Sequence, residues 1–243
     1  MTNDRSHGPG AAGLVALASL ALSALACNGV AHSEEPAQRV PAAVVDESVA
    51  ANPAPEKLVL AGGCFWGIQG VYQHVRGVTR AVSGYAGGSA ANAHYVVVGS
   101  GLTGHAESVE ITYDPKEVTL GALLQIFFSV AHDPTQLNRQ GPDTGSQYRS
   151  AIFVADDVQK RVADAYVAQL GNGHVYQHPI VTRLEPLHGF YPAERYHQDY
   201  LTLNPTEPYI AYNDLPKIEN LRRLFPERYR PTPVLVTAAV AAR

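Results

Sequence analysis

The hexapeptide GGCFWG at residues 62–67 is the stretch that most constrains how this chain folds. The apolar run at residues 58–61 precedes it and is typical of a buried strand. Apolar side chains then recur at helical spacing, at Phe65, Ile68, Tyr72 and Val75. The two glycines therefore predict a tight strand-to-helix turn with Cys64 in the first helical turn. Unpaired amides and the helix dipole there favour a thiolate, the nucleophilic form of cysteine.

Cysteine usage sets limits on this interpretation. The chain has two cysteines, Cys27 and Cys64, too few for a disulfide framework, and it has no Cys-x-x-Cys pair for zinc or redox chemistry. From its position alone, Cys64 could equally be a small buried hydrophobic residue, the common fate of a lone cysteine.

Length and charge exclude several classes of protein. The chain has 243 residues and a net charge of −4, with 46% hydrophobic and 16% charged residues. After removal of an N-terminal targeting region, this suits one domain of about 180 residues. The charge gives no basic surface for nucleic acid, and nothing in the sequence demands more than a monomer.

The N-terminal residues 1–27 have the pattern of an export signal, with a polar start, a short apolar run and small residues before Cys27. The apolar run is too short for a membrane span. The segment 23–27 resembles a bacterial lipobox, in which Cys27 is lipidated, although Ala24 stands where a larger aliphatic residue is usual. Residues 24–26 also satisfy the rule for ordinary signal cleavage. We expect an exported, lipid-anchored protein of the cell envelope or periplasm, rather than a cytosolic protein with an apolar extension.

Three further segments follow. Residues 28–56 are rich in Ala, Pro, Val and acidic residues without periodicity, which predicts a flexible linker. Residues 57–230 are expected to form the catalytic domain. The apolar tail 231–243 has no assigned role.

Strand and helix patterns alternate through the domain. We expect a strand at 78–83 running into a glycine-rich loop, and a strand at 106–113 that alternates cleanly. Thr119 is predicted to cap the next helix, and a polar loop spans 132–147. The remaining expected elements are a strand at 149–154, a helix at 156–170 with Val158, Val162, Ala165 and Tyr166 inward, a strand at 180–184, a helical piece at 193–203 and an amphipathic segment at 208–230. The predicted class is α+β, a two-layer sandwich with a central mixed sheet and an elaborated ferredoxin-like core.

Glu107 is the informative carboxylate. It shares a strand face with Val109 and Ile111, and burial there raises the pKa of a carboxyl, which then donates a proton near neutral pH. The pattern alone favours an acid at a strand end turned towards water.

Several motifs together resemble one family. The segments GCFWG (63–67), GHAE (104–107) and QYRS (147–150), the last ending the loop 132–150, are similar to those of the A-type peptide methionine sulfoxide reductases. The agreement continues through residues 190–198. The resemblance implies reduction of the S epimer of methionine sulfoxide in oxidised proteins and peptides, and of free methionine sulfoxide.

The resemblance also implies roles for individual residues. Cys64 is the nucleophile that attacks the sulfoxide sulfur, and Glu107 is the acid that protonates the departing oxygen. The expected substrate-binding residues are Tyr95 and Tyr148 as donors to the oxygen, Phe65 and Trp66 as an aromatic wall for the methyl group, and Asp143 in the pocket lining. No bound cofactor and no metal are expected. His197 with Glu194 is expected to support the pocket.

No cysteine follows Cys64, whereas members of this family often carry downstream resolving cysteines. The Cys64 sulfenic acid formed by the reaction must then be reduced by an external thiol, either a thioredoxin-like protein or a small thiol.

Two alternative functions stay open at this point. A Cys-His hydrolase or transferase would use His105 or His132 as base, and an envelope binding protein would hold oxidised methionine without reducing it. His174 and His178 have a metal-ligand spacing for a helix, but the glycines and proline around them favour a loop.

Overall fold

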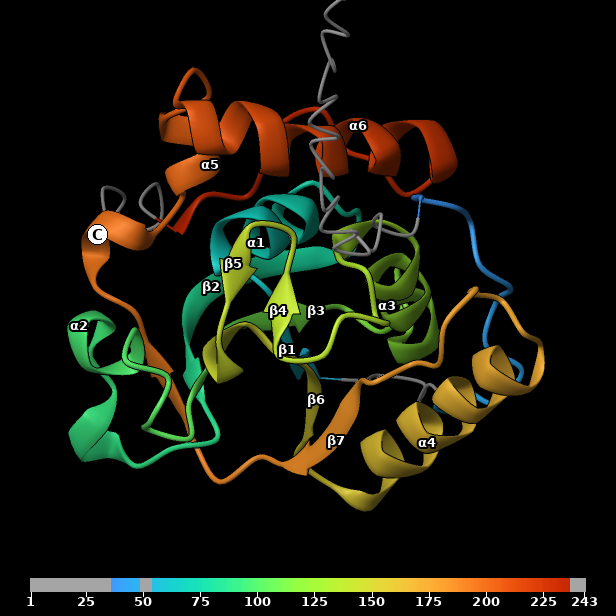
Figure 1. Ribbon diagram of the computed structural model, residues 1–243. Coiled ribbons are helices and arrows are strands. Elements are labelled where there is room, and N and C mark those ends of the chain that lie inside the picture. The colour runs from blue at the N-terminus through green and yellow to red at the C-terminus, as the bar shows by residue number, and fades with distance from the viewer. Residues whose placement is uncertain (1–35, 49–53, 237–243) are drawn as a thin grey trace, which may run out of the picture. The chain divides into compact units, whose positions relative to one another are not determined.

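Six strands form one mixed sheet in the order β7-β6-β1-β3-β2-β8 (Figure 1). This computed structural model describes residues 36–48 and 54–236, so the predicted export signal and Cys27 lie outside the described residues. The strands are β1 (Glu56–Gly62), β2 (Val78–Ala86), β3 (Ala106–Tyr113), β6 (Ser150–Val154), β7 (Arg183–Pro186) and β8 (Phe190–Pro192). A separate hairpin pairs β4 (Arg139–Gln140) with β5 (Asp143–Thr144).

Only β6 and β7 pair in parallel, and the other neighbours in the six-stranded sheet are antiparallel. The inner order β6-β1-β3-β2, with α1 between β1 and β2 and α3 between β3 and β6, is the ferredoxin-like arrangement. The predicted α+β class with a central mixed sheet is confirmed.

The helices are α1 (Phe65–Gln73), α2 (Tyr95–Val98), α3 (Leu120–Ile126), α4 (Asp157–Asn172), α5 (Tyr200–Leu203) and α6 (Leu215–Leu224). Two π-helical turns, Phe127–Ala131 and Ile210–Asp214, continue α3 and lead into α6. Within the described ranges, every helix is too short or too polar to cross a membrane.

Strand β1 separates two layers of apolar side chains because successive residues of a strand point to opposite faces. Leu58 and Leu60 join the main core beneath α1, and both are at most 1% exposed. Val59 and Ala61 belong to a smaller cluster on the other face. Full burial of one leucine contributes about 1.5–3 kcal/mol, so β1 and the turn that follows it are strongly fixed.

The predictions for strand β3 and for the start of helix α3 are both confirmed. Strand β3 has the predicted bounds, and Val109, Ile111 and Tyr113 are all buried. Thr119 caps α3, its side chain accepting a hydrogen bond of 3.3 Å from the main-chain nitrogen of Ala122.

Strand β2 extends beyond its predicted end. Residues 84–86 were expected in a loop because of Gly84, but they pair with β8. A Cβ at position 84 would lie 2.5 Å from the carbonyl oxygen of Tyr191, so the glycine permits the close approach of β8. The sequence pattern cannot reveal a partner strand about 100 residues away along the chain, as this pairing requires.

The inward face of α4 differs by one position from the prediction. Val158 is 46% exposed, whereas Gln159 is buried. The Gln159 side-chain amide donates to the carbonyl oxygen of Lys57 at 2.7 Å and its oxygen accepts from Ala155, so the polar side chain is satisfied inside. The strand predicted at 180–184 is also shifted, to β7, where pairing with β6 sets its register.

Residues 36–48, here named the N-terminal strap, differ from the flexible chain expected for the linker 28–56. The strap runs from the end of α6 past α3 towards α4, in blue in Figure 1. Val40 is 1% exposed and its carbonyl accepts from Gln125 at 2.7 Å. Arg39 donates to the carbonyl of Leu224, and Gln169 of α4 donates to Ala42. Amino-acid composition does not predict this packing, because the segment is held by a single buried valine and by hydrogen bonds between side chains and main-chain carbonyls.

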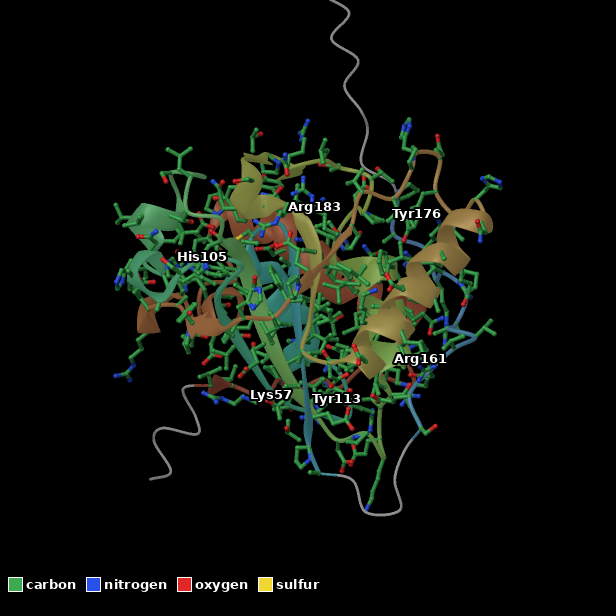
Figure 2. The ribbon with its side chains drawn as sticks, turned by 90° about the horizontal axis from the view of Figure 1, so that it is seen from below. Lys57, His105, Tyr113, Arg161, Tyr176 and Arg183 are labelled. Atoms are coloured by element: carbon green, nitrogen blue, oxygen red, sulfur yellow. The ribbon has the colours of Figure 1, made fainter. Side chains whose placement is uncertain are left out.

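The C-terminal end of the strap is also held by polar contacts. Asp46 accepts hydrogen bonds from Thr119 and from the main chain of Gly121, at the N-terminus of α3. Glu47 accepts from the hydroxyl of Tyr113, which Figure 2 shows at the same end of the sheet as Lys57. Carboxylates at a helix N-terminus satisfy free amides and the helix dipole.

Candidate active site

Cys64 is the N-cap residue of α1, directly after the turn at the end of β1. It is 8% exposed. Gly63 has φ +94°, and a Cβ there would lie 2.5 Å from the Cβ of Gln140. The turn therefore needs glycine on both counts, and it fixes Cys64 against the loop that carries β4 and β5.

Glu107 of β3 lies beside the same turn. Its Oε2 accepts a hydrogen bond of 3.1 Å from the main-chain N–H of Phe65, and the residue is 3% exposed. Burial raises the pKa of Glu107 to about 8; the Phe65 N–H opposes this, and the charges of Asp143 and Asp214 add to it. The carboxyl is therefore protonated near neutral pH, in the form that donates a proton.

The protonation of Cys64 differs from the expectation. Burial raises the pKa of the Cys64 thiol well above its ordinary value, and the charges of Glu107 and Asp214 act in the same direction. The main-chain amide of Trp66 and the Lys217 ammonium lower that pKa, but burial outweighs them. The helix terminus alone does not make a resting thiolate here, so Cys64 rests as a thiol.

The predicted aromatic wall is built in two layers. Trp66 is half-buried and stacks on Tyr200, with ring centroids 4.0 Å apart and 13° between the planes. Its Nε1 donates to Nδ1 of His197 at 3.2 Å, which fixes the indole in place. Phe65 is fully buried, with its ring centroid 5.1 Å from that of His197, so it lies behind the accessible wall.

The two predicted tyrosine donors lie in the same electrostatic neighbourhood. Burial first, and then the charge of Glu107, raise the pKa of Tyr95 to about 12 and that of Tyr148 still further. Both hydroxyls thus keep their protons and can donate hydrogen bonds. The main-chain N–H of Tyr95 donates to Glu194 at 3.0 Å, and the Tyr95 ring lies 4.4 Å from that of His197. Glu194 and His197 therefore hold the wall and Tyr95 together.

Asp143 lies on β5 and accepts a hydrogen bond from the hydroxyl of Tyr209. This contact links the β4–β5 hairpin to the chain before α6. Tyr209 was not singled out from the sequence, because a tyrosine between a proline and an isoleucine has no distinctive pattern. Its ring also lies nearly perpendicular to that of Trp66, with ring centroids 6.0 Å apart.

A buried ion pair was also missed by the sequence analysis. Asp214 is 0% exposed and its Oδ1 accepts from the Lys217 ammonium at 3.0 Å. A Cβ at Gly67 would lie 2.1 Å from the same oxygen, so the last glycine of GCFWG makes room for this pair. The signal that could have found it is an acid and a lysine three residues apart on a helix that begins with Leu215-Pro216.

Arg149 explains part of the QYRS segment. Its guanidinium makes two hydrogen bonds to Glu185, at 2.8 and 2.9 Å, and donates to the carbonyls of Gly104 and Ser146. Arg149 therefore joins the turn before Glu107 to the segment that carries Tyr148. A bidentate pair between an arginine and a carboxylate is well suited to fix two loops relative to each other.

His105 and His132, the two candidate bases, both have structural partners. His105 accepts from the main chain of Gly88 and bonds to the carbonyl of Ser89; Figure 2 shows it near the segment before α2. His132 bonds to the hydroxyl of Ser150 at 2.7 Å, and burial lowers its pKa to about 3. No hydrogen bond joins Cys64 to a histidine in the described part of the chain, so the Cys-His hydrolase reading has no support. His174 and His178 lie in the loop after α4.

A buried cysteine at a helix N-terminus lies beside a protonated carboxyl and an aromatic wall, an arrangement suited to the chemistry of a cysteine-dependent enzyme. The comparisons with known proteins identify its family. A family model described as "Peptide methionine sulfoxide reductase" matches residues 56–229. The chain belongs to the peptide methionine sulfoxide reductase family and is an oxidoreductase that acts on a sulfur group.

Curated relatives agree with this assignment. The chain is 62% identical over 195 residues to "Peptide methionine sulfoxide reductase MsrA 2" of Mesorhizobium japonicum, covering 80% of this chain and 99% of that protein. It is 48% identical over 193 residues to the protein of the same name from Synechocystis, covering 79% and 90%. The resemblance to the A-type enzymes is confirmed.

Solved structures give the same result. Mxr1 from Saccharomyces cerevisiae in its reduced form matches with a TM-score of 0.57 at 35% identity, over 67% of this chain and 93% of that one. Methionine sulfoxide reductase A of Corynebacterium diphtheriae matches with a TM-score of 0.54 at 33% identity, over 72% and 87%. The fold is therefore that of the A-type enzymes.

Proposed function

We propose that the chain reduces the S epimer of methionine sulfoxide with Cys64 as nucleophile and Glu107 as acid. The Cys64 sulfur attacks the sulfoxide sulfur while the proton of Glu107 passes to the sulfoxide oxygen. The S–S bond that forms between the two sulfurs breaks again as the hydroxyl passes from the methionine sulfur to the Cys64 sulfur, so that methionine leaves and Cys64 becomes a sulfenic acid. The proton of the Cys64 thiol replaces the one that Glu107 gave up. The methionine sulfur gains two electrons and the cysteine sulfur loses two.

The observation that carries this proposal is the contact between Phe65 and Glu107, one residue away from Cys64. It supports an acid that is buried, protonated near neutral pH and adjacent to the nucleophile. Cys64 itself rests as a thiol in this site. A bound sulfoxide brings a partly positive sulfur against Cys64, and such a neighbour favours the thiolate at the moment of attack.

The other predicted residues have supporting roles in this scheme. Tyr95 and Tyr148 donate hydrogen bonds to the sulfoxide oxygen as charge develops on it. Trp66 presents the apolar wall for the methyl group, with Phe65 behind it. Asp143, held by Tyr209, lines the pocket on the hairpin side. The same site serves methionine sulfoxide in oxidised proteins and as the free amino acid.

The catalytic cycle closes through an external thiol, because no cysteine follows Cys64 in the sequence. The donor is a thioredoxin-like protein or a small thiol. We further propose export to the cell envelope or periplasm with a lipid on Cys27, based on the pattern of residues 1–27. Incorporation of a labelled fatty acid, lost in Cys27→Ser, tests the anchor.

The reaction itself is tested by reduction of a methionine-S-sulfoxide peptide with dithiothreitol as reductant. Wild type, Cys64→Ser and Cys27→Ser are compared, so that each cysteine is removed by the same substitution. Turnover should vanish in Cys64→Ser and persist in Cys27→Ser. Turnover that persists in Cys64→Ser would refute the assigned nucleophile, and binding without any reduction by wild type would favour the envelope binding protein.

A further inference from the structure

A pocket of about 170 Å³ has Cys64 in its lining but none of Glu107, Tyr95 or Tyr148. Its other walls come from several separate parts of the chain, among them the segment 128–133 that follows α3 and four further parts. These four are the strap at Ala37, the hairpin at Gln140, the turn before α6 at Asn213 and α6 itself at Lys217. Cys64 is therefore bordered by a space that the residues assigned to the sulfoxide do not share.

The proposed function does not say where the reducing thiol binds. The inference made here rests on that function. The Cys64 sulfenic acid must be reduced by a thiol from outside, and Cys64 is the free cysteine of the described residues. Because Cys64 is 8% exposed, the attacking sulfur has to enter the protein to reach it. About 170 Å³ is several times the ~30 Å³ that one water occupies in the liquid, which gives room for a small organic molecule.

We propose that this pocket, here named the thiol pocket (Ala37, Cys64, Gln140, Asn213 and Lys217), receives the small-molecule thiol that reduces the Cys64 sulfenic acid. The sulfoxide substrate approaches Cys64 from the side of Glu107 and the tyrosines. Oxidant and reductant then reach one sulfur atom through different walls of the site.

The thiol pocket has a cation in its lining. The Lys217 ammonium lines it and is held in place by the buried carboxylate of Asp214 at 3.0 Å. Asp133 is the acidic residue of the lining, and its oxygens accept hydrogen bonds from Thr135 and from the side chain of Gln136. His132, also in the lining, is neutral because burial lowers its pKa to about 3. Lys217 is thus the cation of this wall, and it offsets part of the negative charge of Asp133 and Asp214 that a thiolate would meet.

The step balances with two molecules of thiol. A thiolate attacks the Cys64 sulfur, an S–S bond forms, the S–O bond breaks, and the hydroxide leaves as water after it takes up a proton. A second thiolate attacks the outer sulfur of this mixed disulfide, which releases a symmetrical disulfide and the Cys64 thiolate. The two thiols supply the two electrons that Cys64 lost to the sulfoxide.

The test separates the two half-reactions in the full chain. Reduced protein is mixed with an equimolar methionine sulfoxide peptide, and the methionine formed in this single turnover is measured. The oxidised protein is then mixed with 2-mercaptoethanol, and the loss of sulfenic acid is followed by mass. The variant Ala37→Trp fills the thiol pocket, and Val44→Trp is the matched control on the same strap, at a residue that is 84% exposed and outside the lining.

We expect Ala37→Trp to form methionine at a rate within about twofold of wild type but to react with 2-mercaptoethanol about tenfold more slowly. Val44→Trp should match wild type in both steps. Ala37→Leu, with a smaller side chain, should slow the thiol step by an intermediate factor, which guards against a fold defect in the larger variant.

Three results would overturn the inference. An unchanged thiol step in Ala37→Trp would show that reductant enters elsewhere. Loss of methionine formation in a folded Ala37→Trp would mean that the pocket holds the sulfoxide instead. Failure of wild type to form methionine in the single turnover would remove the proposed function itself, and the thiol step with it.

Discussion

The main-chain N–H of Phe65 donates a hydrogen bond of 3.1 Å to Oε2 of Glu107, so the residue that follows the proposed nucleophile is bonded to the proposed acid. This contact joins the first turn of α1 to β3 inside the sheet core. The turn that positions Cys64 therefore also positions the carboxyl of Glu107.

Replacement of Glu107 by Gln keeps an acceptor for the Phe65 N–H and removes the transferable proton. We expect the single-turnover rate of methionine formation to fall by about 10²–10⁴-fold, the usual contribution of a general acid. Glu110→Gln is the matched control on the same strand, where Glu110 pairs with Lys57 at the surface. A rate in Glu107→Gln close to that of wild type would remove Glu107 from the mechanism.

The raised pKa of Glu107 also predicts a dependence of stability on pH. The carboxyl titrates near its ordinary value of 4.5 when the chain is unfolded and at about 8 when it is folded. Stability is therefore fully present below the unfolded pKa and is lost as the pH rises through the folded one. Urea unfolding of Glu107→Gln should lack this loss, whereas Glu110→Gln should follow wild type. If the free energy of unfolding changed with pH in the same way for all three proteins, a buried, protonated Glu107 would be contradicted.

Alkylation measures the state of Cys64 directly. Because burial and the charges of Glu107 and Asp214 raise its pKa, the rate with iodoacetamide should stay low at neutral pH and rise only in alkaline solution. In Glu107→Gln the alkaline rise should move to lower pH, since one of the two carboxylates is gone. A fast reaction of wild type at neutral pH would indicate a resting thiolate instead.

The bond from Tyr209 to Asp143 should matter for substrate binding more than for chemistry. Tyr209→Phe removes the donor and frees the β4–β5 hairpin, and we expect KM for a sulfoxide peptide to rise about tenfold, equivalent to roughly 1.4 kcal/mol, with kcat little changed. Tyr212→Phe is the control, because Tyr212 is 82% exposed. Equal KM values for the two variants would show that the bond does not organise the pocket.

The N-terminal strap offers a comparison of two valines four residues apart. Val40 is 1% exposed and Val44 is 84% exposed. Val40→Ala should lower the free energy of unfolding by about 1–3 kcal/mol, because it leaves a cavity beside α3. Val44→Ala should change it by less than about 0.5 kcal/mol. Equal effects, measured by urea denaturation, would mean that the strap is not part of the folded domain in solution.

The sequence by itself determined the local elements around Cys64. The apolar run, the two glycines and the helical spacing after Cys64 are all local signals, and they specify the turn at the start of α1. The alternation of β3 and the cap at Thr119 are equally local, since each depends on residues within one element.

The tertiary structure decided what depends on residues distant in the chain. The pairing of β8 with Gly84, the strap over α3, the bond from Tyr209 to Asp143 and the ion pair against Gly67 all join distant segments. The protonation of Cys64 and Glu107 belongs here too, because desolvation is set by everything that packs around a group. A helix N-terminus predicts a thiolate from its own residues, but the surrounding core determines whether a charge is stable there.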